Sequence, residues 1–172
     1  LVAPVAGSSP RARFRLLESV RDFAAEMLDR PEPLRRAHAR HYTALAERLD
    51  ADLQSERIDD AIDAMRAAWP NLRIAARLAA EDAPELVRRL IRSVGPYADV
   101  VQAYEVLEWC ERADLTRSGT DPAVSADALA VQARMLAHRG DLERARQLAE
   151  TAHGWCETHA SLLSLVWCAY YR

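Results

Sequence analysis

The segment of residues 126–152, ADALAVQARMLAHRGDLERARQLAETA, constrains the fold of this chain more strongly than any other stretch. Apolar and small residues recur on both sides of Gly140-Asp141 at the three- and four-residue spacing of an amphipathic helix. These residues are Leu129, Ala133 and Leu136 before the turn, and Leu142, Ala145 and Ala152 after it. Small residues let two antiparallel helices approach closely, and larger ones fill the gaps beside them. The segment therefore predicts a tight helical hairpin that turns at Gly140.

Helical spacing continues through most of the remaining chain. From Pro33 onward, amphipathic stretches follow one another, each bounded by Pro, Gly, Asp or Thr. We expect the helices to break at Pro70 and at Gly95-Pro96, because proline lacks the amide hydrogen that a helix interior needs. A further helix is expected over residues 99–113. Short helices at regular spacing are typical of stacked pairs, so the predicted fold class is mainly α.

The N-terminal region has a different period. Arg11, Arg13 and Arg15 alternate with apolar or small residues, as in a strand with one polar face. A short apolar run, LVAPV, precedes them, and the intervening AGSSP has the composition of a turn. We therefore expect a β-hairpin, followed by a helix that ends before Pro31 and Pro33.

Composition excludes several classes of function. All 23 basic residues among the 172 are arginine. A P-loop, a Schiff-base enzyme and a kinase-type ATP site each need a lysine, so none of these can lie within the chain. The net charge of -3 argues against nonspecific binding to nucleic acid, which needs a basic surface. No apolar run reaches the roughly 18 residues of a membrane-spanning helix, and we expect a soluble protein.

The three cysteines, Cys110, Cys156 and Cys168, show no CxxC spacing, so neither a disulfide framework nor a zinc site is indicated. Reduced thiols in a cytoplasmic protein are the favoured interpretation. A nucleophilic Cys110 would need a base beside it. Its neighbours in EWCER are acids, which raise a thiol pKa, so a packing role is favoured over catalysis.

The spacing of His153, Cys156 and His159 would bring three possible metal ligands to one side of a continuous helix. We expect Gly154 and Thr158 to break that helix. Cys156 is then better explained as a packing residue, and no metal is predicted.

Residues 126–152 resemble the tetratricopeptide repeat, a helix-turn-helix unit of about 34 residues. The small-residue positions and the RGDL turn agree with that family, whereas its Trp, usual Tyr and terminal Pro are missing. EVLEWCERA, ending at Ala113, aligns with RQLAETA, ending at Ala152, 39 residues later. The longer connection DLTRSGTDPAVS accounts for the excess over the ideal period.

Two further motifs carry a broader resemblance. RFRLLESVRDFAAEML is similar to the end of the winged-helix domain in STAND-class signal-transducing ATPases. AHARHYTALAE and AAWPNLRIAARLA are similar to the linker helices that follow it in LuxR- and AfsR-like bacterial transcription regulators. The resemblance implies three parts: a winged-helix remnant at 1–32, linker helices at 33–82 and tetratricopeptide-like repeats at 83–172. It also implies that the chain starts inside its first domain and that the fold is an α-α superhelix.

The same resemblance implies a regulatory, non-catalytic function. The repeats would bind a protein or a small-molecule effector in their groove and would communicate with a nucleotide-binding domain that this fragment lacks. ATP or ADP is expected in that missing domain, and no cofactor is expected here. DNA would be contacted only through parts of the parent protein that are absent from this chain. The location would be cytoplasmic, with no membrane contact.

The best candidates for binding a partner are three residues of the predicted groove, Asp127, Arg134 and His138. On the first helix of the hairpin, Asp127, Ala130, Arg134 and His138 should face the concave wall. Arg134 and His138 lie one turn apart and could hold a carboxylate or another polar group. The alternative is a solvated face in which Asp127 attracts Arg134.

Arg11, Arg13 and Arg15 form a second candidate site. A row of guanidinium groups on one strand face could contact the phosphates of DNA. The alternative is a solvated strand edge, where charge discourages pairing with other strands.

The sequence leaves two other functions as alternatives to the sensor. A passive helical scaffold would dimerise, and the aromatic residues Trp167, Tyr170 and Tyr171 would supply an exposed interface. A small helical enzyme is disfavoured, because no set of acid, base and nucleophile converges in the sequence.

Overall fold

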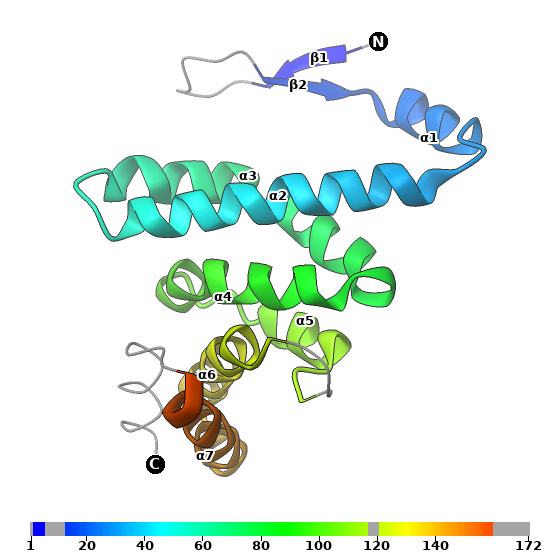
Figure 1. Ribbon diagram of the computed structural model, residues 1–172. Coiled ribbons are helices and arrows are strands. Elements are labelled where there is room, and N and C mark those ends of the chain that lie inside the picture. The colour runs from blue at the N-terminus through cyan, green and yellow to red at the C-terminus, as the bar shows by residue number, and fades with distance from the viewer. Residues whose placement is uncertain (1, 6–12, 117–120, 160–172) are drawn as a thin grey trace. The chain divides into compact units, whose positions relative to one another are not determined.

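The computed structural model describes residues 2–5, 13–116 and 121–159 (Figure 1). The chain divides into two compact units, Leu1–Leu34 and Arg35–Arg172. Helices account for most of the described residues, which confirms the prediction of a mainly α-helical fold.

The first unit contains two short strands and a helix. Strand β1 (Val2–Val5) pairs antiparallel with β2 (Arg13–Leu16), with Val2 opposite Leu16 and Val5 opposite Arg13. The predicted turn and Arg11 lie outside the described residues. Helix α1 (Glu18–Glu26) follows directly, with Glu18 in its first turn, where a carboxylate interacts favourably with the helix dipole.

The helices of the second unit follow one another along the chain, and the first of them begins in the first unit. Their bounds are α2 (Pro31–Leu53), α3 (Ile58–Asp82), α4 (Pro84–Val100), α5 (Val106–Ala113), α6 (Pro122–Arg139) and α7 (Leu142–His159). Proline occupies the first position of α2, α4 and α6, where its missing N–H is not needed. Asp121 caps α6 by accepting a hydrogen bond from the Ala123 N–H at 3.0 Å.

The predicted helix breaks at Pro70 and Gly95-Pro96 were wrong. Helix α3 continues through Pro70, and α4 continues through Gly95 and Pro96. Buried residues keep their helical spacing on both sides of each proline, as the core positions show: Met65, Ala68, Leu72 and Ala75 in α3, and Ile91, Val94 and Ala98 in α4. The buried face on each side of the proline thus outweighs the local loss of a hydrogen bond.

Two further boundaries differ from the sequence prediction. The expected helix over 99–113 is divided, because α4 ends at Val100 and α5 begins at Val106. Gln102, between them, adopts a left-handed backbone with φ of 54°, which a helix interior does not tolerate. The predicted break at Gly154 was also wrong, since α7 runs on to His159. One glycine costs a helix only about 1 kcal/mol, and the buried Ala149 and Ala152 hold this one in place.

Helix α4 lies at the centre of the second unit, in contact with α3, α5 and α6 (Figure 1). Most of its residues are buried, including the arginine Arg88, which is 1% exposed. The Arg88 Nη2 donates hydrogen bonds to the carbonyl oxygens of Ala113, at 2.9 Å, and Asp114, at 2.7 Å. These carbonyls belong to the end of α5, where a helix has no intrahelical donors left, so Arg88 ties α5 to α4.

Polar side chains one turn apart in the middle of α2 join it to α4. The Thr43 hydroxyl donates to the Leu86 carbonyl at 3.5 Å. Arg89 forms a two-pronged ion pair with Glu47, with both N···O distances at 2.8 Å. Two parallel hydrogen bonds fix orientation as well as distance, so α2 and α4 are held in a defined register.

Candidate functional site

The predicted hairpin is formed by α6 and α7. Gly140 ends α6 with a left-handed φ of 93°, and the Asp141 N–H donates to the Leu136 carbonyl at 2.9 Å. The alanines predicted to pack, Ala133, Ala145 and Ala152, are all buried. Leu142 was wrongly predicted to join them and is 67% exposed. It is the first residue of α7, directly after the turn.

Two of the predicted groove residues meet a carboxylate of the chain itself. Asp99, in the last turn of α4, lies with Oδ2 3.2 Å from Arg134 Nε and with Oδ1 3.0 Å from His138 Nδ1. The Arg134 side chain is 7% exposed and that of His138 is 40% exposed. The structure therefore brings this pair together around Asp99, a residue that the sequence pattern had not singled out. Binding of an external partner by the pair remains a prediction.

Asp127, the third predicted residue, lies in a different electrostatic setting. It is half-buried near Asp50 of α2, which also faces Arg92 of α4. Burial raises the pKa of Asp50, Arg92 opposes that rise, and the negative charge of Asp127 adds to it. Asp50 thus experiences a favourable charge from Arg92 and an unfavourable one from Asp127.

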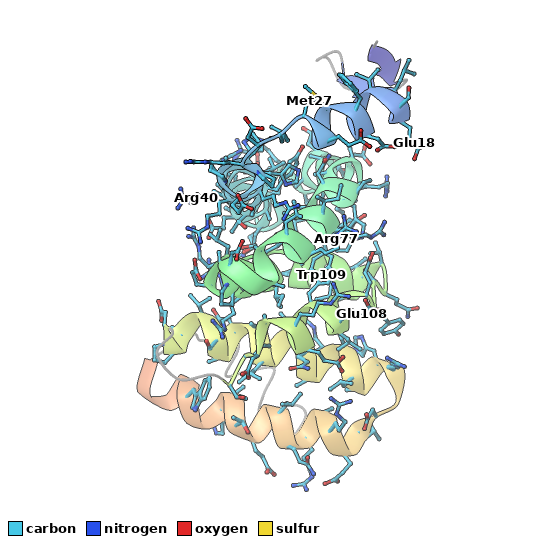
Figure 2. The ribbon with its side chains drawn as sticks, turned by 90° about the vertical axis from the view of Figure 1, so that its right-hand side faces the viewer. Glu18, Met27, Arg40, Arg77, Glu108 and Trp109 are labelled. Carbon is cyan, nitrogen blue, oxygen red and sulfur yellow. The ribbon has the colours of Figure 1, made fainter. Side chains whose placement is uncertain are left out.

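A second site was not anticipated from the sequence. A hollow of about 210 Å³ opens between α3 and α5. It is lined by Arg73, Ile74, Ala76 and Arg77 of α3, by Glu108, Trp109 and Arg112 of α5, and by Glu105 just before α5. Figure 2 shows Arg77, Trp109 and Glu108 near one another on the face toward the viewer. The Arg73–Arg77 pair, one helical turn apart on α3, was the available sequence signal.

Glu105 organises one side of the hollow. Its Oε2 lies 2.5 Å from Arg73 Nε, and its Oε1 lies 2.8 Å from Arg73 Nη2. The Trp69 indole N–H also donates to Oε1, at 2.7 Å. The hydrogen bonds from Arg73 lower the pKa of Glu105 despite partial burial, and Trp69 lowers it further. Glu105 is therefore ionised and held in place at neutral pH.

Trp109, which lines the hollow, belongs to a cluster of aromatic rings. Trp69 stacks on Trp109, with ring centroids 5.6 Å apart and planes inclined by 28°. Trp69 also packs against Tyr97 of α4, with ring centroids 5.3 Å apart. Such pairs contribute about 0.5–1.5 kcal/mol beyond the area they bury, so the rings hold α3, α4 and α5 together.

The other charged side chains of the hollow are paired weakly or have no described partner. Arg112 reaches Glu108 only at 4.0 Å, and both side chains are more than half exposed. Arg77 is exposed and has no ion-pair or hydrogen-bond partner among the described residues. An exposed guanidinium without a described partner, at the edge of a hollow that Trp109 also lines, can bind an anionic or planar group.

Other candidates from the sequence contribute little to a site. Cys110 is buried, and its pKa is raised first by burial and then by Glu111, so it is a packing residue as expected. Among the side chains that the structure describes, no three possible metal ligands gather. The side chains of Cys156 and His159 lie outside that set.

The remaining predicted contacts fall at the ends of the chain. Arg13 and Arg15 lie in β2, and their side chains are not described, so their contact with phosphates stays a prediction. Trp167, Tyr170 and Tyr171 lie outside the described residues.

Comparison with protein families, with curated proteins and with solved structures finds no match for this chain. Within the described ranges, none of the helices combines the length and apolar character needed to cross a membrane.

Proposed function

We propose that this chain is a non-catalytic sensing segment of a STAND-type, LuxR/AfsR-like transcription regulator, which binds a small ligand or a protein through tetratricopeptide-like helical pairs. The observation that carries the proposal is the hollow between α3 and α5, which the exposed Arg77 and the aromatic Trp109 both line. The α6–α7 hairpin, closed by alanines and turned at Gly140, supports the likeness to tetratricopeptide repeats. The order β1, β2, α1 agrees with the end of a winged-helix domain.

Binding would act on the parent regulator by shifting a conformational equilibrium. A ligand changes such an equilibrium only by its difference in affinity for the two states. Because α3 and α5 both contact α4, a ligand between them would favour one spacing of these helices. That spacing would in turn affect how the helical array meets the ATP-binding domain expected in the parent protein.

The proposal is tested in the parent gene and in its transcriptional output. We expect the reading frame that encodes the chain to carry a Walker motif upstream of Leu1. In the full-length regulator, Arg77→Glu should change the induced output of a reporter promoter. Arg48→Glu is the matched control, since Arg48 is also an exposed arginine inside a helix without a described partner.

Two results would contradict the proposal. A reading frame without a Walker motif would exclude the STAND class. Unchanged output after both Arg77→Glu and deletion of α6–α7, with the protein present at normal levels, would exclude a sensing role.

A further inference from the structure

The charges that line the hollow define the charge of a suitable ligand. Three guanidinium groups and two carboxylates face the space, which leaves one net positive charge. Arg73 and Glu105 neutralise each other through paired hydrogen bonds. Arg112 and Glu108 are 4.0 Å apart, so a ligand can compete for Arg112. A monoanion therefore fits better than a phosphate dianion, which Glu105 and Glu108 would repel.

The shape and the apolar walls of the hollow define the rest of the ligand. Trp109 of α5 and Ile74 and Ala76 of α3 contribute its apolar lining. The volume of about 210 Å³ exceeds the roughly 150 Å³ of a cavity that accepts benzene, and it is below the 300 Å³ or more of drug-sized pockets. One aromatic ring with a short acidic substituent matches this size. Guanidinium groups also stack on aromatic faces, so arginines in the wall favour a planar ring over an aliphatic chain.

We propose that the hollow between α3 and α5 binds a small aromatic monocarboxylate. The carboxylate lies between Arg77 and Arg112, and the ring lies against Ile74 and Trp109. Arginine suits this role because its planar fork matches both oxygens of a carboxylate. The inference rests on the proposed binding function and names the ligand class of that site.

Titration of the complete chain with benzoate tests this inference. Binding is followed by calorimetry and by tryptophan fluorescence, because Trp109 lines the site and stacks on Trp69. Benzoate should bind, and benzamide, which has nearly the same shape without the charge, should bind at least tenfold more weakly. Inorganic phosphate should bind more weakly than benzoate, and raising the salt concentration should weaken benzoate binding because the site is open to solvent.

Variants identify the residues responsible. Arg77→Gln and Arg112→Gln should each weaken benzoate binding about tenfold, the loss expected for one charge-assisted contact of roughly 1.4 kcal/mol. Arg48→Gln should leave it unchanged. Circular dichroism and the thermal midpoint check that each variant is folded, and the comparison of benzoate with benzamide needs no variant.

Three outcomes would overturn the inference: no benzoate binding, equal affinity for benzamide, or phosphate binding more tightly than benzoate. Each of them leaves the sensing role standing if Arg77→Glu still changes the reporter output. Conversely, benzoate binding with an unchanged reporter would support the carboxylate site and contradict the sensing role.

Discussion

The packing of α6 against α4 and α7 differs sharply from the packing of α3 against α5. In the first region Gly95 and several alanines lie among the buried residues where the helices meet, and the polar side chain at the crossing, Arg134, is held by Asp99. In the second region the rings of Trp69 and Trp109 make the contact, and a hollow remains beside them. Small residues let helices close on each other, whereas large rings hold them apart.

An arginine without an ion-pair partner is tolerated at the hollow but not at the α4–α6 crossing. At the α4–α6 crossing, Arg134 is nearly enclosed and a carboxylate of the chain lies against it. At the edge of the hollow, Arg77 stays in contact with water, so it can remain charged without a partner at little cost. The candidate ligand site therefore lies in the more loosely packed region, although the sequence pattern drew attention to the tighter one.

The largest expected effect is at the tighter region. Asp99→Asn removes the negative charge that faces Arg134 and His138. Because Arg134 is nearly buried, we expect unfolding free energy to fall by about 2–3 kcal/mol, somewhat less than for a fully buried pair. Urea denaturation measures the change. The matched control is Asp63→Asn, which removes a solvent-exposed pair with Arg66 and should cost under about 1 kcal/mol. If Asp99→Asn and Asp63→Asn lowered the unfolding free energy equally, the buried pair would contribute no more than the exposed one, and the explanation would be wrong.

The second effect concerns the close approach of α4 and α6. A Cβ atom added at Gly95 would overlap with the Val131 side chain, whose branched Cβ restricts its rotation. Overpacking costs about 1–3 kcal/mol, and the better helix propensity of alanine returns up to about 1 kcal/mol. We therefore expect Gly95→Ala to lower the unfolding free energy by about 1 kcal/mol. Adding Val131→Ala should relieve the overlap, so a double variant that shows simple additivity in a thermodynamic cycle would contradict this explanation.

The third effect is at the hollow. Glu105→Gln removes the ion pair with Arg73, and it should lower stability by about 0.5–1 kcal/mol at neutral pH, since Arg73 is half exposed. The pKa of Glu105 is lowered in the folded chain. The ionised Glu105 therefore stabilises the folded state fully above the ordinary carboxyl pKa of 4.5, and this stabilisation is lost as the pH falls through the lowered pKa. The difference in unfolding free energy between the original chain and Glu105→Gln should therefore become smaller in acid. Glu108→Gln is the control in the same wall, and a loss as large as that of Glu105→Gln would refute the special role of Glu105.

The smallest effect has the opposite sign. The folded chain raises the pKa of Asp50, so it binds that proton more tightly than the unfolded chain does. Stability then declines as the pH rises from the ordinary carboxyl range through the raised pKa. Asp50→Asn should stabilise the protein at pH 7 by only a few tenths of a kcal/mol, because solvent screens the group. Thermal unfolding at several pH values should show that the stabilisation by Asp50→Asn disappears in acid. An equally large stabilisation at low pH would exclude the ionisation of Asp50 as its cause.

Sequence periodicity was sufficient to predict the helical class and the hairpin at Gly140. Such features depend on the spacing of small and apolar residues along one segment, which is visible in a single sequence. The continuity of α3 through Pro70 was not predictable in this way, because it depends on what other helices place against Met65 and Leu72. Tertiary packing there overrides the local preference of proline.

The candidate sites were harder to predict for a related reason. Arg134 and His138 were correctly placed on one helix face, but the carboxylate between them comes from α4, 35 residues earlier than Arg134 in the chain. The hollow combines Arg77 with residues of α5 that are more than 25 positions away. Neither pairing leaves a periodic trace, since each depends on how separate helices cross. The winged-helix and tetratricopeptide resemblances remain proposals.

The hydrogen bonds from Arg88 to the end of α5 restrict how the hollow can change its width. Separating α5 from α4 would deprive the buried Arg88 guanidinium of two carbonyl acceptors, so these two helices are held together. Helix α3, the other wall, is held by its own contacts with α4 and by the ion pair of Arg73 with Glu105. Both walls are thus anchored to α4, which limits how far the hollow can widen.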